Sequence, residues 1–286
     1  MFGELPKLTI LVVFLILTLL YAIRFILRKE IPFVSYINYL WIYFLIFSVA
    51  EIFSFKIAVW ILAILCFWSL REYFSLIDIR LQDRWGIIGA YLSIPFMIYY
   101  IQIDWYGMFI VSIPVYAFLM IPFLIAIGGK ESKGIIFSTG AIDFGMFLFV
   151  YCLGHIGYLA LYSRWMAIML ITNVVICDII TYFIQKKTIP VLKSIMLKYF
   201  ISSPFTVLMT VLLSNWTTIP TGHSISLGLM IPVLIIIGNH TINYIKFDLG
   251  IDEKNMCPGR GAVIDNMKSI FYSAPVVFHY IRYFLK

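Results

Sequence analysis

The sequence is poor in charge. Only 12% of its 286 residues are Asp, Glu, Lys or Arg, while 63% are hydrophobic. A soluble domain of this length has far more charged surface, so the composition excludes an ordinary soluble globular protein. Long apolar stretches separated by short polar ones are typical of a polytopic membrane protein. The sequence therefore predicts an all-α integral membrane protein with about nine or ten transmembrane helices.

Cysteine and histidine are also scarce. The four cysteines lie far apart and form no CxxC pair, so neither a zinc ribbon nor a disulfide framework is indicated. No histidine pair has HxxxH or HExxH spacing, and the chain contains neither a P-loop nor a GxSxG nucleophile elbow. The net charge is +7, but no long basic tract lies beside aromatic residues. This pattern argues against nucleic acid as a partner and favours attraction to anionic lipid headgroups.

What the sequence has in abundance is apolar segments long enough to cross a bilayer. We expect nine of them, at about residues 8–24, 31–49, 57–70, 86–103, 106–127, 134–153, 165–184, 200–213 and 224–245. The aromatic segment 269–285 is either a tenth span or a helix that lies at the interface. We divide the chain into N-terminal membrane helices, residues 1–133, and a C-terminal catalytic-like membrane region, residues 134–286, with a cytoplasmic polar loop at 246–268.

The distribution of basic residues predicts the orientation. They cluster after the odd-numbered spans, whereas the loops after the even-numbered spans contain few. By the positive-inside rule, the N-terminus faces outside and the polar loop faces the cytoplasm, where nucleoside triphosphates are found. We therefore expect an integral protein of the cytoplasmic (inner) membrane.

The polar loop combines charge with glycine more densely than any other part of the chain. It contains Lys246-Phe-Asp-Leu-Gly-Ile-Asp252 and, after a short gap, Pro258-Gly-Arg-Gly-Ala-Val-Ile-Asp265. Pro258 and Gly259 favour a turn, and Gly259 and Gly261 let backbone amides approach a ligand closely. A ligand-binding loop is one interpretation, and a solvated connection between two spans is the other.

The charged side chains of this loop suit phosphates and a metal ion. Asp252 and Asp265 are hard oxygen ligands of the kind that Mg²⁺ prefers. Lys246 and Arg260 can neutralise phosphate charge. Taken as a site, the loop would bind a nucleotide with Mg²⁺.

Two acidic residues fall inside predicted spans. Asp178 lies late in the seventh span and Asp143 in the middle of the sixth. An ionisable group at this depth is costly, so a functional role is the first hypothesis for both. For Asp178 the alternative is a salt bridge to Lys186 or Lys187, two turns further on. Asp143 either lines a cavity or is a hydrogen-bonding partner between helices.

The polar loop resembles the signature of the phosphatidate cytidylyltransferase (CDP-diacylglycerol synthase) family, in which K-R and K-D precede P-G-H-G-G-x-x-D-R-x-D and an apolar A-P-V-like run. Lys246 matches the first lysine, and Asp252 matches the aspartate of K-D if one residue is missing. The positions that match in register are Pro258, Gly259, Gly261 and Asp265, followed by the run 269–278. The departures mark a divergent member: Phe247 for Arg, Arg260 for His, Ala262 for Gly, Asn266 for Arg and Lys268 for the last Asp.

Earlier segments continue this resemblance. Asp178-Ile-Ile-Thr-Tyr182, followed by Gln185-Lys186, is similar to the family's D-x-x-A-Y-x-x-G-K. Glu72 resembles a glutamate at the cytoplasmic end of an early span, and a salt bridge with Arg80 or Arg84 is the alternative. The S-P-x-K-T-x-E-G block of the family is not intact, and only fragments of it remain, at 190–194 and 202–206.

The resemblance implies a reaction in which CTP and phosphatidic acid, or a similar membrane lipid phosphate, give CDP-diacylglycerol and pyrophosphate. It implies that Asp178, Asp252 and Asp265 hold Mg²⁺ and act in catalysis together with Lys246. The substrate-binding residues that it implies are Arg260, Gly259, Gly261, Tyr182, Lys186 and Glu72. It also suggests a homodimer.

Three other readings stay open. The same core could act on a lipid phosphate with ether or prenyl chains instead of acyl chains. The chain could be a degenerate homologue without turnover that supports a membrane assembly. Spans interrupted by glycine and proline, such as residues 228–232, would also suit a transporter, although no inverted repeat supports this.

Overall fold

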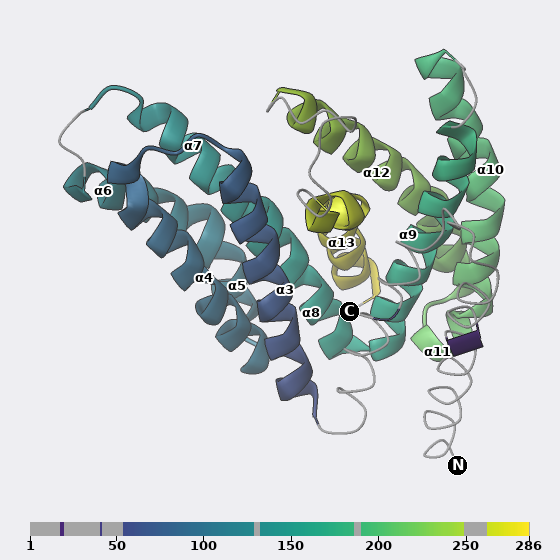
Figure 1. The fold of residues 1–286 in the computed structure, drawn as a ribbon. Coiled ribbons are helices and arrows are strands. Elements are labelled where there is room, and N and C mark those ends of the chain that lie inside the picture. Colours follow the sequence, from purple (N-terminus) through teal and green to yellow (C-terminus); the bar gives the residue numbers. More distant parts are fainter. Residues whose placement is uncertain are drawn as a thin grey trace. The chain divides into compact units, whose positions relative to one another are not determined.

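The computed structural model describes residues 18–19, 41, 54–128, 132–185, 190–248 and 262–285, drawn as ribbons in Figure 1. The predicted spans at 8–24 and 31–49 lie outside the described residues, apart from 18, 19 and 41. The chain divides into two compact units, Met1–Leu62 and Ala63–Lys286. Residues from 63 onward belong to the second unit, and the division at residue 133 stays a prediction.

Every regular element that the structure describes in the second unit is a helix. In chain order these are α3 (Phe55–Leu76, which begins in the first unit), η1 (Leu81–Asp83), α4 (Arg84–Gln102), α5 (Tyr106–Val111), η2 (Ser112–Ala117), α6 (Phe118–Gly128), α7 (Ile135–Met146), η3 (Phe147–Cys152), α8 (Leu153–Tyr162), α9 (Arg164–Gln185), α10 (Val191–Leu212), α11 (Ser214–Thr217), α12 (Thr221–Asp248) and α13 (Ala262–Leu285). The segments η2 and η3 are π-helical and join their neighbours into continuous runs.

Six helical runs among the described residues are long and apolar enough to cross a membrane. They are Phe55–Leu76, Tyr106–Gly128, Ile135–Tyr162, Arg164–Ile184, Lys193–Leu212 and Thr221–Asp248. The expectation of an all-α integral membrane protein is therefore confirmed. The number of nine or ten spans stays a prediction.

The helices extend further than the predicted spans at several ends. The span expected at 134–153 continues to Tyr162, and the one expected at 200–213 begins at Val191. Lys193 and Lys198, which we expected in a loop, are therefore helical. Hydropathy falls at polar residues, but backbone hydrogen bonding continues through them, and lysine side chains can extend toward the membrane surface.

The polar loop is shorter than predicted for the same reason. Helix α12 continues to Asp248 and α13 begins at Ala262. Lys246 is thus part of α12, and residues 262–268 form the first turns of α13. Only residues 249–261 separate the two helices, and these lie outside the described residues.

Helix α12 packs closely on α10. The hydroxyl of Thr206 donates to the carbonyl of Gly228 at 2.7 Å, and that of Thr210 donates to the carbonyl of Ser224 at 2.8 Å. A Cβ atom added at Gly228 would lie 2.5 Å from the Cα atom of Val207. The absence of a side chain at this position permits the close approach, as small residues do between membrane helices.

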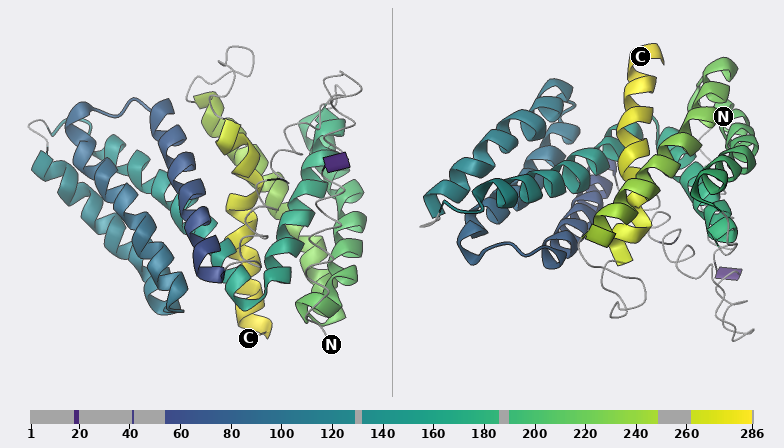
Figure 2. Two further views of the ribbon diagram at one scale, coloured as in Figure 1. Left: turned by 60° about the horizontal axis from the view of Figure 1, so that its bottom comes forward. Right: turned by 90° about the horizontal axis from the view of Figure 1, so that it is seen from above.

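Helix α13 lies between the group α3–α8 and the group α9–α12 (Figures 1 and 2), and it contacts α8, η3, α9 and α12. Near its start, the backbone N–H of Ile264 donates to Glu72 Oε2 at 2.9 Å. Near its end, the Arg282 guanidinium lies 3.4 Å from the centroid of the Tyr106 ring and donates to the Tyr162 hydroxyl.

These contacts at the two ends of α13 join it to opposite sides of the bundle, because Glu72 is near the end of α3 and Tyr162 is at the end of α8. Helix α13 therefore extends from one side of the bundle to the other, and its assignment as a tenth span stays a prediction. Its charged residues lower its hydropathy, and it is not among the six apolar runs. We call the side where α12 ends and α13 begins the signature side.

Candidate functional site

Asp178 is held by side chains from two other helices. Its Oδ1 atom accepts a hydrogen bond from the Ser269 hydroxyl on α13 at 2.6 Å and from the Asn239 amide on α12 at 3.3 Å. The Ser269 hydroxyl also lies 3.0 Å from Asn239 Oδ1. No described residue donates a hydrogen bond to Asp178 Oδ2, and the side chain is only half-buried. One carboxylate oxygen is therefore fixed, and the other is available to a ligand.

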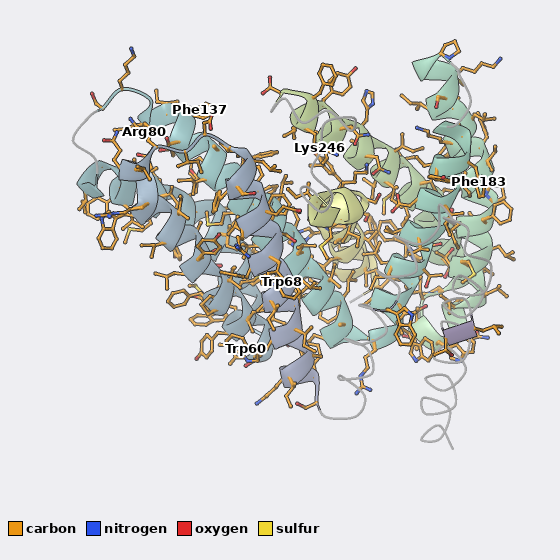
Figure 3. The ribbon with its side chains drawn as sticks, viewed as in Figure 1. Trp60, Trp68, Arg80, Phe137, Phe183 and Lys246 are labelled. Atoms are coloured by element: carbon orange, nitrogen blue, oxygen red, sulfur yellow. The ribbon has the colours of Figure 1, made fainter. Side chains whose placement is uncertain are left out.

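The same network continues toward the signature side. Lys268 Nζ donates to Asn243 Oδ1 at 3.1 Å and lies within electrostatic range of Asp178. Asn239, Asn243 and Lys246 recur at helical spacing along α12, so they share one face of that helix. Lys246 is only 5% exposed, and it lies toward the same side of the bundle as Arg80 (Figure 3). Amide and ammonium groups thus border the Asp178 carboxylate.

Glu72 fixes the start of α13. Its carboxylate accepts the hydrogen bond of the Ile264 backbone N–H, one of the first N–H groups of this helix, which have no partner within the helix. A carboxylate is also favoured there by the helix dipole. Glu72 does not form the salt bridge weighed as its alternative role, since the one ion pair between described residues joins Arg80 and Asp83. The contact makes Glu72 a positioning residue for the helix that carries Asp265.

Asp265 lies in the first turns of α13. It is four residues before Ser269, so the two residues occupy the same face of the helix, one turn apart. Ser269 contacts Asp178. Asp265 therefore lies on the α13 face that meets Asp178, one turn closer to the signature side.

The other predicted site residues separate into two groups. Tyr182 lies one turn beyond Asp178 on α9, is half-buried, and contacts the Phe183 ring edge-on. The residues outside the described part of the chain are Lys186, Asp252, Gly259, Arg260 and Gly261. Within the described part, no three His, Cys, Asp or Glu side chains gather as metal ligands would. The convergence of Asp178, Asp252 and Asp265 stays a prediction.

The described residues do fit a hard divalent ion such as Mg²⁺. The Oδ2 atom of Asp178 is the type of ligand that this ion prefers, and the bonds from Ser269 and Asn239 keep the carboxylate oriented. Asp178 would be one ligand of such an ion. Mg²⁺ usually retains several waters and few protein ligands, so a single fixed carboxylate in this part of the chain is compatible with it.

Sequence reasoning did not identify Asn239, Asn243 and Ser269 as members of the site. A signal was present, because Asn239, Asn243 and Lys246 are polar residues at helical spacing near the end of an otherwise apolar span. Ser269 had no comparable signal, since a lone serine in an aromatic segment is common. Only the hydrogen bond to Asp178 in the structure shows that Ser269 belongs to the site.

Asp143 lies in α7, apart from this network. It is 4% exposed, and within the described residues neither of its carboxylate oxygens has a hydrogen-bond partner. The reading of Asp143 as a hydrogen-bonding partner between helices is therefore wrong for the described part of the chain. His155, on the predicted outer side, donates through Nδ1–H to the Tyr151 carbonyl oxygen at 2.8 Å, and its ring contacts those of Phe109 and Tyr151.

These features define an all-helical membrane protein with a polar site of carboxylate, amide and ammonium groups set between its helices. The model of the cytidylyltransferase family matches residues 33–284, so the chain belongs to the cytidylyltransferase family. It is also similar to the uncharacterized protein YnbB of Escherichia coli (strain K12), with 25% identity over 246 residues, which are 77% of this chain and 78% of that protein. No solved structure matches it. The chain is thus a cytidylyltransferase-like enzyme, and its family implies CTP as a substrate.

Proposed function

We propose that the protein transfers the cytidylyl group of CTP to phosphatidic acid or a similar lipid phosphate, and so forms CDP-diacylglycerol and pyrophosphate. The observation that carries the proposal is the Asp178 carboxylate of α9, which Ser269 fixes through one oxygen while the other oxygen is available to a ligand. This carboxylate meets the face of α13 that also carries Asp265. A polar site within membrane-crossing helices suits a reaction in which one substrate stays in the bilayer.

The reaction is an in-line displacement. An oxygen of the lipid phosphate attacks the α-phosphorus of CTP, and a new P–O bond joins the lipid phosphate to the cytidylyl group. The bond from the α-phosphorus to the oxygen that bridges to the β-phosphate breaks, and pyrophosphate leaves with the electron pair. Such a reaction needs little covalent chemistry from the protein, so positioning and charge neutralisation dominate catalysis.

The residues of the chain divide these tasks. Asp178, with Asp252 and Asp265, would hold Mg²⁺, which when bound neutralises phosphate charge and aligns the two substrates. Lys246 and Arg260 would offset the charge of the CTP phosphates. Gly259 and Gly261 would offer backbone amides, and Lys186 and Tyr182 would border the substrates.

The orientation follows from the basic residues. Lysines and arginines concentrate on the signature side, which by the positive-inside rule faces the cytoplasm. We therefore place the site at the inner leaflet of the cytoplasmic membrane, where it is open to CTP. A homodimer, as the resemblance suggests, is part of the proposal.

The test is release of pyrophosphate from CTP by purified protein in the presence of defined lipid phosphates. The panel contains phosphatidic acid, its ether-linked analogue and a prenyl phosphate, each with Mg²⁺ or with EDTA. We expect turnover that needs both Mg²⁺ and a lipid phosphate, and we expect Asp265→Asn to abolish it. Mg²⁺-independent turnover, or full activity of Asp265→Asn, would remove the metal role. Absence of both turnover and CTP binding would favour the degenerate homologue that supports an assembly.

A further inference from the structure

Helix α12 carries two asparagines one turn apart, and their amides have different hydrogen bonding. Both ends of the Asn239 amide bond to protein, because its nitrogen donates to Asp178 Oδ1 and its oxygen accepts from the Ser269 hydroxyl at 3.0 Å. In Asn243 the oxygen accepts from the Lys268 ammonium at 3.1 Å. Within the described part of the chain, no group accepts a hydrogen bond from Asn243 Nδ2.

The contact with Lys268 determines which end of the Asn243 amide is open. An ammonium group has three donors and no acceptor, so the Asn243 atom that meets it is the carbonyl oxygen. The amide nitrogen points in another direction, and its N–H groups are left for an acceptor other than the described residues. A bond from an ammonium group to the oxygen also polarises the amide, which strengthens donation from its nitrogen. Asn243 therefore presents an oriented hydrogen-bond donor.

This donor lies next to the Asp178 site. Asn243 is one turn from Asn239 toward the signature side, which is roughly 6 Å along α12. Asn239 and Ser269 both bond to Asp178, and Lys268 directly precedes Ser269 on α13. Asn243 is half-buried, so a ligand can reach it. A ligand that meets the open oxygen of Asp178 and extends toward the signature side therefore passes the Asn243 amide.

The acceptor that suits this amide best is an anionic oxygen. The Lys268 ammonium places a positive charge beside the amide, and this favours an anion over a neutral acceptor. A hard divalent ion at Asp178 would have phosphate oxygens as its other ligands. A phosphate group presents several acceptor oxygens, so one of them can accept from an amide while another meets the ion. The geometry thus matches a phosphate group.

We propose that Asn243 binds a phosphate group of a substrate by donating from Nδ2 to a phosphate oxygen, while Lys268 orients the amide. The proposal rests on the function proposed above and goes beyond it, since it assigns substrate binding to Asn243. This residue precedes Lys246, where the match to the family signature begins, so the resemblance gives it no role. CTP and a lipid phosphate share the phosphate oxygen as acceptor, and kinetics separate these two sources.

Two variants of similar shape distinguish donation to a phosphate from a purely structural bond to Lys268. Asn243→Asp keeps an oxygen for the ammonium and replaces the donor nitrogen by a second oxygen, whereas Asn243→Leu removes both ends without adding charge. At saturating Mg²⁺ we expect kcat/KM to fall about tenfold or more in Asn243→Leu and at least as far in Asn243→Asp. The apparent melting temperature of Asn243→Asp should stay close to wild type. An Asn243→Asp enzyme that is nearly as active as wild type would overturn the proposal.

Varying each substrate in turn shows which phosphate the amide binds. A rise in KM confined to CTP assigns the amide to the nucleotide, and a rise confined to phosphatidic acid assigns it to the lipid. Either result supports the proposal. The matched control is Tyr244→Phe, which removes a hydroxyl from the neighbouring residue, whose side chain is 65% exposed. It should stay within about twofold of wild type, and a loss equal to that of Asn243→Leu would overturn the assignment to Asn243.

Equilibrium binding separates this proposal from the proposed reaction, because it needs no turnover. Calorimetry would compare CTP with cytidine, and native mass spectrometry would compare phosphatidic acid with phosphatidylcholine, each with Mg²⁺. We expect both Asn243 variants to bind CTP or phosphatidic acid about tenfold more weakly, with cytidine and phosphatidylcholine unaffected. Such a loss in a protein without turnover supports the Asn243 contact although the reaction fails. Unchanged binding of both phosphates by the folded variants overturns it, even if the enzyme turns over CTP.

Discussion

Asp178 and Asp143 both lie inside membrane-crossing helices of this protein, and their surroundings differ completely. Asp178 is half-buried and receives hydrogen bonds from Ser269 and Asn239, while Lys268 lies nearby. Asp143 is 4% exposed, and within the described residues its carboxylate has no hydrogen-bond partner. The first carboxylate is oriented and accessible, whereas the second is enclosed.

The difference shows that membrane depth alone does not identify a functional residue. Both aspartates fall inside predicted spans, where a charged group is costly, and sequence reasoning suspected both. A carboxylate that binds a substrate or a metal ion needs an oriented oxygen with access to it, and supporting residues that fix it. Only the region of α9, α12 and α13 provides these for a described aspartate.

The largest effect is expected from removing the charge at Asp178. Asp178→Asn keeps the shape and can still accept the bond from Ser269, but it loses the anionic oxygen. We expect kcat/KM for CTP-dependent pyrophosphate release to fall about 100-fold or more, the size typical of an electrostatic group in a transition state. Asp143→Asn should change it less than about twofold. Equal losses from both variants would break the distinction between the two regions.

The second prediction sharpens the role of the residues that orient Asp178. Ser269→Ala removes the hydroxyl that bonds to Oδ1 at 2.6 Å, and a hydrogen bond to a charged group is worth about 1.5–3 kcal/mol. We expect about a tenfold loss in kcat/KM or more, together with a higher Mg²⁺ concentration for half-maximal rate. Ser269→Thr should restore most of the activity. The control is Ser273→Ala, whose hydroxyl bonds only to backbone carbonyls of its own helix. A Ser269→Ala protein with unchanged Mg²⁺ dependence would contradict the orienting role.

The third prediction concerns how closely α12 approaches α13. A Cβ atom added at Gly238 would lie 3.0 Å from the Lys268 carbonyl oxygen and 3.0 Å from the Tyr272 ring. Gly238→Ala should push the helices apart at the level of Asn239 and destabilise the fold by about 1–3 kcal/mol. The apparent melting temperature and the activity should fall together. Gly140→Ala, in α7, meets no atom within 4 Å and should leave both unchanged or slightly raised.

The sequence predicted the fold class and most of the helices, because apolar segments of span length leave few other structures in a bilayer. It failed at helix ends, where Lys193, Lys198 and Lys246 were expected in loops and lie in helices. Hydropathy averages over a window and therefore ends a span at a polar residue. The backbone has no reason to leave the helix there, because a lysine side chain can reach the surface from within it.

For the site, the sequence pointed to Asp178 on physical grounds and through its resemblance to a family, and it placed Glu72 and Asp265 on the same side of the membrane. It could not show that Glu72 binds the backbone at Ile264, because that contact joins residues 192 positions apart. The sequence also could not show that Asp178 receives hydrogen bonds from neighbouring helices and that Asp143 does not. The number of hydrogen bonds that a buried side chain receives depends on which helices are neighbours, and a hydropathy pattern contains no such information.

A smaller effect is expected at the start of α13. Glu72→Ala removes the carboxylate that accepts the Ile264 N–H, and loss of such a cap costs about 1 kcal/mol. We expect a lower apparent melting temperature and a reduction in activity of a few-fold, because the first turn that carries Asp265 loosens. Glu72→Gln keeps an acceptor oxygen, so it should retain most of the activity and a melting temperature close to that of the wild type. If Glu72 instead bound a substrate through its charge, Glu72→Gln would be as defective as Glu72→Ala, and the melting temperature would not follow the activity.

The smallest effect is expected at Asp143, and it tests the other side of the comparison. Asp143→Leu replaces an enclosed carboxyl that has no partner among the described residues by an apolar side chain of similar size. Removing an unsatisfied buried polar group in this way is neutral or stabilising, by about 1 kcal/mol here, so the apparent melting temperature should stay the same or rise by a few degrees. Catalytic activity should be retained, since Asp143 lies outside the network that holds Asp178. A stable Asp143→Leu protein without activity would show that α7 carries a second functional carboxylate, and accessibility would then no longer distinguish the two regions.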